Sequence, residues 1–269
     1  MSKRYCYWSL GTGPYARLLE RCVASAREAG VFKEFHVLTD RAIAGCECYD
    51  AQQVETTGGL YQLIYLKAGI SKLLFDYFIW IDADSWFVRN PKNVLDCLGK
   101  SPIHVPLATD LSALEETKLL NGISTRQFAD LMVKAGVFNP VYLSASSFWI
   151  VHHDAIDRVC DLALHFRAFA KDKGFTVNVS AGLGYAMQML CADPEAHRLS
   201  GRPDLWASDD CNHFAGRLPE NSPWPLEDPL TGETQLVNPS IIHLPHHKDQ
   251  VQDLTEASMR SSSMGAVEA

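Results

Sequence analysis

Two aspartates separated by one residue, Asp82 and Asp84, follow an apolar run in the first half of the chain. The residues before them, 78–81, are apolar and β-favouring, which is typical of a strand buried on both faces. Residues two apart on a strand point to the same side, so we expect the two carboxylates to converge. Like charges repel at close range, and burial raises that cost unless a cation lies between them. The pair therefore predicts a site for a hard divalent cation.

A simpler interpretation of the pair is that an aspartate at the end of a strand caps a turn or is solvated. The pattern Asp-x-Asp is also short enough to occur by chance. The functional interpretation is favoured because the pair follows a long buried strand and is flanked by Trp80 and Trp86.

A second segment with suitable chemistry is "IIHLPHHKDQ", residues 241–250. Its three histidines and one lysine could bind a metal or an anionic phosphate, and His243 falls within a short predicted strand. Taken alone, the segment fits a satisfied core histidine and a polar tail equally well. Together with the two carboxylates, His243 would complete a Mn²⁺ or Mg²⁺ site with open positions for a diphosphate. Lys248 would then offset charge on the leaving phosphate.

The first half of the chain alternates between strand and helix patterns, which predicts an α/β fold with a mostly parallel sheet. The expected strands are 4–10, 34–40 and 77–88, and the expected helices are 14–29 and 60–75, with Leu74 on the apolar side of the second helix. Ligands of such sheets bind beyond the carboxyl ends of the strands. Residues 9–13, Asp40 and residues 82–84 would all lie at that edge.

The second half is less regular. The patterns predict an edge strand or loop at 101–110, a helix divided at Gly122 within 112–135, and a strand or strand pair at 141–153. An amphipathic helix is expected at 154–170, a long Pro-rich loop at 200–240 and a disordered tail at 254–269. No repeat or linker divides the chain. We therefore expect a single domain over 1–253, with a nucleotide-binding half at 1–100 and an acceptor half at 101–253.

The composition excludes several classes of protein. Hydrophobic residues make up 47% and charged residues 21%, as in ordinary globular proteins, and the net charge of −8 argues against a nucleic-acid binder. No apolar run is long enough for an integral membrane segment, and no signal peptide is evident. Most of the eight cysteines lie among apolar neighbours, which is typical of reduced thiols and favours a cytoplasmic location.

The order of these features resembles the GT-A glycosyltransferases, especially the metal-dependent retaining enzymes of the glycogenin and bacterial lipopolysaccharide galactosyltransferase kind. The resemblance rests on "RYCYWSLGTG", "FHVLTD" and "SKLLFDYFIWIDADSWFV", on a strand at 142–151 and on the histidine-lysine segment near the C-terminus. It runs through most of the chain, and the Asp-x-Asp context is its specific part. It implies the GT-A fold, with a mixed, mostly parallel sheet and helices on both faces.

The resemblance also implies an activity and a set of site residues. The enzyme would transfer a hexose from a nucleotide sugar, a UDP-sugar, to a glycan or other hydroxyl acceptor. Asp84, His243 and Asp82 would hold the metal, and Asp82 could instead touch the ribose. The implied donor-binding set is Ser9, Leu10, Gly11, Asp40, Lys67, Lys72, Asp82, Ala83 and Lys248.

The sequence departs from the family pattern in two places. The terminal motif of the family is His-x-x-Gly-x-x-Lys, whereas this chain has His246 at the glycine position and Lys248 one residue early. The usual Asn-x-Gly of the middle strand is "SASS", residues 144–147. Two carboxylates within the Pro-rich loop, Asp209 and Asp210, are the candidate catalytic groups, as a nucleophile in a retaining transfer or as a base in an inverting one.

Two other functions compete with this interpretation. The departures favour a non-catalytic protein that binds a sugar nucleotide or a glycan. A haloacid-dehalogenase-type phosphatase also places Asp-x-Asp after a buried strand, but on its first strand and with Thr or Val where this chain has Trp86. Three aromatic residues of the Pro-rich loop could stack on sugars or could anchor the loop to the core, namely Trp206, Phe214 and Trp224.

Overall fold

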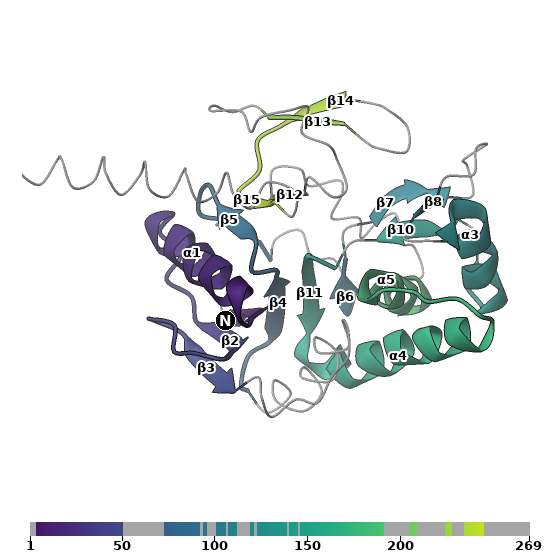
Figure 1. Cartoon of the computed structure of the whole chain (residues 1–269), viewed down its shortest axis with the longest axis horizontal. Coiled ribbons are helices and arrows are strands. Elements are labelled where there is room, and N and C mark those ends of the chain that lie inside the picture. Colours follow the sequence, from purple (N-terminus) through teal and green to yellow (C-terminus); the bar gives the residue numbers. More distant parts are fainter. Residues whose placement is uncertain are drawn as a thin grey trace, which may run out of the picture.

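A six-stranded mixed sheet forms the centre of the molecule in a computed structural model (Figure 1). The structure describes residues 4–50, 73–91, 94–95, 101–105, 107–111, 119–120, 123–138, 140–144, 146–190, 205–208, 224–227 and 234–244. The strand order is β3-β2-β1-β4-β11-β6, with bounds β1 (Tyr5–Gly11), β2 (Phe35–Thr39), β3 (Glu47–Asp50), β4 (Tyr77–Ile81), β6 (Ile103–His104) and β11 (Phe148–His152). The first four strands in this order pair in parallel, and β11 is antiparallel to both of its neighbours. The mixed, mostly parallel sheet expected from the sequence is confirmed.

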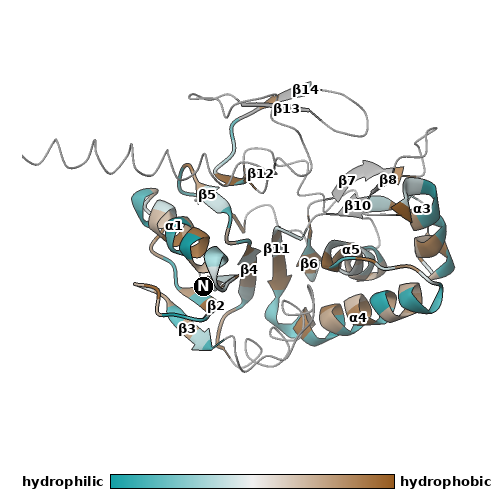
Figure 2. Cartoon of the chain, viewed as in Figure 1, coloured by the Kyte–Doolittle hydropathy of each residue, from teal (hydrophilic) through white to brown (hydrophobic). Residues whose placement is uncertain are grey.

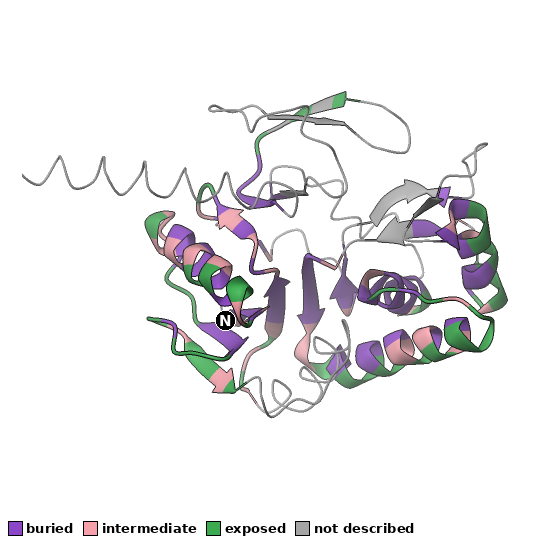
Figure 3. Cartoon of the chain, viewed as in Figure 1, coloured by how far each residue is buried: buried purple, intermediate pink, exposed green. Residues whose placement is uncertain are grey.

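Strand β4 lies between β1 and β11 and is covered on both faces (Figure 3). Ile79 and Ile81 belong to the core that packs beneath helix α1, whereas Phe78 and Trp80 belong to the core on the opposite face. All four side chains are at most 3% exposed. The isoleucines and the phenylalanine of this strand are strongly hydrophobic on the scale of Figure 2, and the run therefore reflects burial on two sides.

Helix α1 (Pro14–Glu28) covers one face of the sheet. Pro14 stands in its first turn, where a missing N–H costs little, and Gly30 ends it with a φ of 76°. The helix lies very close to the end of β1. A Cβ at Gly11 would be 2.7 Å from the backbone oxygen of Tyr15 and 2.9 Å from Cβ of Leu19. Glycine at this position therefore permits the close approach of helix and strand.

The opposite face is covered by α4 (Ile156–Asp172), preceded by the short 3₁₀ helix η4 (His153–Ala155), and by α5 (Val179–Leu190). Gly182 allows these two helices to pack tightly, because a Cβ there would be 2.9 Å from the backbone oxygen of Ala163. Helix α3 (Thr125–Lys134) packs against both and begins at a capping box of Ser124 and Gln127. Helices on both faces, as expected, are confirmed.

Four smaller sheets surround this core. The one above the carboxyl end of β4 has the order β12-β15-β5, and the others are the pairs β10-β7, β13-β14 and β8-β9. Their bounds are β5 (Ser85–Phe87), β7 (Leu107–Asp110), β8 (Leu119–Leu120), β9 (Ile123–Ser124), β10 (Tyr142–Ser144), β12 (Trp206–Ser208), β13 (Trp224–Glu227), β14 (Thr234–Val237) and β15 (Ile241–His243). The strand pair expected within 141–153 is confirmed as β10 and β11, which belong to different sheets.

The interpretation of 200–240 as one long loop is wrong for the described part of this segment, which contains β12, β13 and β14. Pro225 lies inside β13, which pairs with β14 alone among the described strands, and proline is found on such edge strands. Trp206 on β12 is 6% exposed and stacks on Phe148 with ring centroids 6.2 Å apart. This residue anchors its segment to the core. Phe214 lies outside the described residues.

Two helix predictions are also corrected. Within 112–135, residues 119–120 and 123–124 form the β8-β9 pair, and the helix begins only at Thr125, where the capping box sets its start. Of the helix expected at 60–75, residues 60–72 lie outside the described part. Residues 73–75 are not helical, and Leu74 is 82% exposed. The N–H of Phe75 donates to the carbonyl of Leu73 in a tight turn, and the N–H groups of Asp76 and Tyr77 both donate to the carbonyl of Arg4, so none of them makes a helical hydrogen bond.

Among the described residues, no helix combines the length and apolar character needed to cross a membrane. Cys6, Cys22 and Cys160 are buried free thiols, in agreement with their apolar neighbours in the sequence. The tail at 254–269 lies outside the described residues.

Candidate metal centre

The turn that joins β4 to β5 carries both aspartates of the motif. The backbone N–H of Ser85 donates to the carbonyl of Asp82 at 3.1 Å, which closes a four-residue turn over 82–85. Asp82 and Asp84 thus lie in the turn and not on one strand. The expected convergence of the two side chains is correct, but the alternation of side chains along a strand is not its cause.

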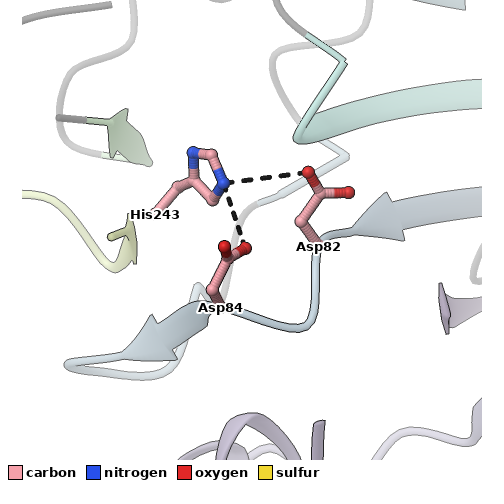
Figure 4. Close-up of side chains that lie close together, drawn as sticks. All are labelled: Asp82, Asp84 and His243. Atoms are coloured by element: carbon pink, nitrogen blue, oxygen red, sulfur yellow. Dashed lines mark ion pairs between the residues drawn. The ribbon is translucent and has the colours of Figure 1, made fainter. Parts of the chain in front are cut away.

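His243 joins the two carboxylates from the last strand, β15. Its Nε2 lies 3.1 Å from Oδ1 of Asp84 and 3.7 Å from Oδ2 of Asp82 (Figure 4). One ligand atom from each of the three residues can be chosen so that all lie within 4.8 Å of one another. The exposed fractions of the side chains are 4% for His243, 10% for Asp84 and 28% for Asp82. The cluster is therefore largely shielded, with Asp82 nearest to solvent.

Backbone hydrogen bonds hold the turn from two sides. On one side, β15 pairs with β5 so that His243 lies opposite Ser85, and the N–H of Leu244 donates to the carbonyl of Asp84 at 3.0 Å. On the other side, the N–H of Asp82 donates to the carbonyl of Ser147 at 2.9 Å. Segments far apart in the sequence thus fix the positions of the three side chains.

The "SASS" segment supports the site through its backbone. Ser147 contributes the carbonyl that accepts from Asp82, and Ser146 accepts a hydrogen bond from the hydroxyl of Ser180 at 2.9 Å. Ser180 lies in the first turn of α5, so this contact ties the segment to that helix. Sequence reasoning missed this role because a backbone carbonyl leaves no signature of residue type.

A tryptophan binds one of the carboxylates directly. The indole Nε1–H of Trp80 donates to Oδ1 of Asp82 at 2.6 Å. The Trp80 ring is 3% exposed and stacks on Trp149, with centroids 6.2 Å apart and planes inclined by 20°. From the sequence, Trp80 was expected only to flank the aspartates as an apolar residue. Its position two residues before Asp82 was the available signal, since side chains at that spacing near a strand end can meet.

One cysteine, Cys22, is close enough to the two aspartates to be affected by their charge. Burial, followed by the negative charge of Asp84, raises the pKa of Cys22, which lies on the buried side of α1. This shift favours the neutral thiol over the thiolate. Among the described residues, the cluster offers two carboxylates and one imidazole, a hard oxygen and nitrogen set that fits Mn²⁺ or Mg²⁺ and leaves coordination positions open.

The remaining described residues of the expected donor set lie at the same edge of the sheet. Ser9 and Leu10 are near the end of β1, with Ser9 fully buried, and Ala83 is in the turn at 5% exposure. Asp40 follows β2, and its Oδ2 accepts a hydrogen bond from the backbone N–H of Gly13 at 2.7 Å. That bond lowers the pKa of Asp40. The structure therefore gives Asp40 a role in holding the loop between β1 and α1, and its contact with a nucleotide stays a prediction.

Five of the predicted site residues lie outside the described part of the chain: Lys67, Lys72, Asp209, Asp210 and Lys248. Their predicted roles toward phosphate and acceptor are neither supported nor opposed by the structure. The described centre consists of the three side chains on the β4-β5 turn and β15.

Comparison with known proteins gives a match in structure only. No protein-family model and no curated protein sequence matches the chain. The galactosyltransferase LgtC, solved in complex with donor and acceptor sugar analogs, superposes with a TM-score of 0.58 at 12% identity, covering 93% of this chain and 95% of LgtC. An active-site mutant of LgtC gives a TM-score of 0.57 at 11% identity, with the same coverage of both chains. The chain therefore has the GT-A fold of LgtC, as the sequence features had indicated.

Proposed function

We propose that this chain is a metal-dependent glycosyltransferase that moves a hexose from a nucleotide sugar, a UDP-sugar, to a glycan or another hydroxyl acceptor. The observation that carries the proposal is the convergence of Asp82, Asp84 and His243 at the carboxyl edge of the sheet. This edge is where α/β sheets bind nucleotides. The fold of LgtC, a galactosyltransferase solved with donor and acceptor sugar analogs, supports the same assignment.

Asp82, Asp84 and His243 would hold Mn²⁺ or Mg²⁺. When bound, such a cation neutralises the negative charge of a diphosphate leaving group. An acidic chain of net charge −8 does not readily supply that positive charge by itself. The chain contributes preformed ligands, since the turn that carries both carboxylates is fixed by hydrogen bonds to Ser147 and Leu244. Fixed ligands lower the cost of ordering the site when the donor binds.

The groups that would act on the substrates come from segments outside the described residues. We assign Lys67, Lys72 and Lys248 to the donor phosphates, where a cation stabilises developing negative charge. We assign Asp209 and Asp210 to the acceptor side, one of them as the base on the attacking hydroxyl or as the nucleophile.

The proposal is tested by calorimetry of UDP binding with and without Mn²⁺, on the wild type and on Asp84→Asn. We expect binding that requires Mn²⁺ and that weakens at least about tenfold in the variant, since Asp84 is the carboxylate closest to His243. Asp154→Asn, which alters an exposed carboxylate elsewhere on the molecule, is the control and should bind as the wild type does. UDP binding that ignores both Mn²⁺ and Asp84 would contradict the proposal.

A binding protein without transferase activity would pass the calorimetric test. The two are separated by incubating the chain with Mn²⁺ and a panel of UDP-sugars and measuring UDP release over time. Glycosyltransferases of this kind release UDP on transfer to an acceptor or, more slowly, to water. Tight binding of a UDP-sugar with no release in the presence of candidate acceptors would favour the binding protein.

A further inference from the structure

We infer that Trp80 is a positioning residue that orients Asp82 for the cation, an inference that rests on the proposed function. The indole Nε1–H of Trp80 donates to Oδ1 of Asp82 at 2.6 Å. The other oxygen, Oδ2, is the one directed toward His243, at 3.7 Å. One carboxylate oxygen is thus occupied by the indole, and the other is presented to the site.

The donor in this bond is itself rigid. Trp80 is 3% exposed, its backbone lies within β4, and its ring stacks on Trp149 of the neighbouring strand. A carboxylate rotates freely about its last bond unless something holds it, because that torsion has a broad energy profile. A buried N–H that donates to an ionised oxygen is among the stronger hydrogen bonds in proteins. Trp80 can therefore fix the plane of the Asp82 carboxylate before any cation binds.

The backbone of the same residue is fixed independently, by the hydrogen bond from the N–H of Asp82 to the carbonyl of Ser147. Asp82 is the most exposed of the three ligands, at 28%, and so receives the least support from packing. It is the ligand for which an orienting hydrogen bond matters most. Loss of a group that orients a metal ligand typically weakens metal binding about 10–100-fold.

The structure offers a closely matched control. Trp149 lies directly opposite Trp80 in the β11-β4 register, stacks on the same ring and is 1% exposed. Its indole nitrogen has no hydrogen-bond partner among the residues that the structure describes. The substitutions Trp80→Phe and Trp149→Phe remove the same atoms from the same stacked pair, and only the first removes a hydrogen bond to Asp82.

The experiment measures the dissociation constant of Mn²⁺ alone by electron paramagnetic resonance, for the wild type, Trp80→Phe, Trp149→Phe and Asp84→Asn. We expect about 10–100-fold weaker binding in Trp80→Phe, less than about threefold change in Trp149→Phe, and loss of binding in Asp84→Asn. Equal affinities in the two tryptophan variants would overturn the role of Trp80 while leaving the metal site intact. A wild type that does not bind Mn²⁺, or an unaffected Asp84→Asn, would overturn the proposed function and this inference with it.

A second measurement covers the case in which Trp80→Phe does not fold. Indole N–H resonances of the ¹⁵N-labelled wild type are followed during titration with diamagnetic Mg²⁺, and are assigned from through-space contacts along β4 and from the Trp149→Phe spectrum. We expect the Trp80 resonance to shift more than that of Trp149, because only the Trp80 indole donates to a ligand of the cation. An unmoved Trp80 resonance at saturating Mg²⁺ would overturn the inference.

Discussion

The two ends of β4 carry similar residues and differ in what those residues do. At each end, aspartates and histidines lie close together. In each case the histidines come from another strand or from the residues that follow it. The carboxyl-end cluster consists of Asp82, Asp84 and His243, and the amino-end cluster consists of Asp76, His152, His153 and Asp154. By residue type alone, the amino-end cluster is the richer of the two in potential metal ligands.

At the amino end, the polar atoms serve the local backbone. Oδ2 of Asp76 accepts from the N–H of Arg4 at 2.7 Å, and Nδ1 of His152 accepts from the N–H of Asp154 at 3.2 Å, where η4 begins. The imidazole of His152 also packs edge-on against Tyr77, with centroids 5.0 Å apart. The side chain of Asp154 is 84% exposed. These contacts end one strand and start a helix, and they leave no shielded set of converging ligands.

At the carboxyl end, burial gives the same residue types a different consequence. Two carboxylates that are 10% and 28% exposed face one imidazole that is 4% exposed. Solvated carboxylates cost little free energy, whereas shielded like charges that converge require a compensating cation or proton. Convergence from distant segments, together with shielding, therefore distinguishes a candidate metal site, and the number of acidic and histidine residues does not.

The largest expected effect is the stabilisation of the folded protein by Mn²⁺, which should depend on the carboxyl end of β4 and not on its amino end. At a Mn²⁺ concentration about 1,000 times the dissociation constant, the wild type should gain about 4 kcal/mol, which corresponds to a rise in melting temperature of roughly 10 °C. His243→Ala should lose this gain, because it removes the imidazole that faces both carboxylates. His153→Ala, at the amino end, should keep it. Differential scanning calorimetry with and without Mn²⁺ measures both.

A reversed result for this pair of variants would contradict the comparison. If His153→Ala lost the stabilisation by Mn²⁺ and His243→Ala kept it, the cation would bind at the amino end of β4. The apo melting temperature of each variant serves as its own reference, so that general loss of stability is not mistaken for loss of metal binding.

A second, smaller effect concerns the helix behind the carboxyl end. Gly11→Ala should destabilise the fold by about 1–3 kcal/mol, because the added Cβ would meet the backbone of Tyr15 and the Cβ of Leu19, neither of which can move without shifting α1. Cys22 and Ser25 of α1 lie against the β4-β5 region, where the hydroxyl of Ser25 accepts from the N–H of Phe87. Urea denaturation measures the loss.

The control for this variant is Gly13→Ala, two residues further along the chain, at the start of α1. Gly13 has a φ of 56° and nothing within 4 Å of an added Cβ, so its substitution strains the backbone without a steric clash. We expect a loss of about 1 kcal/mol for this variant. A Gly11→Ala protein as stable as the wild type would show that α1 can shift away from β1 at little cost.

Sequence was sufficient for the elements that carry strong local signals. The β1-α1-β2 order and the buried run of β4 follow from periodicity, from Pro14 and from Gly30, and the position of the aspartates follows from the end of that run. His243 was inferred to be the partner of the two aspartates from its residue type. For the strands, the helix and the aspartates, the determining interactions lie within one segment of the chain, whereas the histidine was inferred together with the Asp-x-Asp pair.

The features that sequence did not predict depend on contacts between distant segments. The β12-β15-β5 sheet joins three-residue strands that have no periodicity to detect, and it is this sheet that brings His243 to the aspartates. Helix α5 was missed because nearly all of its residues are buried, so it lacks an apolar stripe, and because Gly182 and Gly184 lower its helix propensity. The hydrogen bond between Trp80 and Asp82 depends on the orientation of two side chains, which residue types alone do not determine.

The smallest expected effect concerns a buried histidine that lies at neither end of β4. His36, the second residue of β2, is 3% exposed, and its Nδ1 is hydrogen-bonded to the hydroxyl of Tyr49 at 2.9 Å. Burial lowers its pKa below 6.5, although the nearby carboxylate of Glu34 partly offsets the shift. The unfolded chain therefore binds a proton at this residue more readily than the folded protein does.

From this sign, stability contributed by neutral His36 is fully present above about pH 6.5 and is lost as the pH falls from there toward the lowered folded pKa. The difference in unfolding free energy between the wild type and His36→Gln should therefore shrink between pH 7 and pH 5, measured by urea denaturation at each pH. Glutamine keeps a polar group beside Tyr49 and does not titrate, so the change with pH isolates the imidazole. A difference that grew on acidification would mean that the charge of Glu34, and not burial, has the larger effect on the pKa of His36. His36 would then resemble His243, whose surroundings are set by carboxylates.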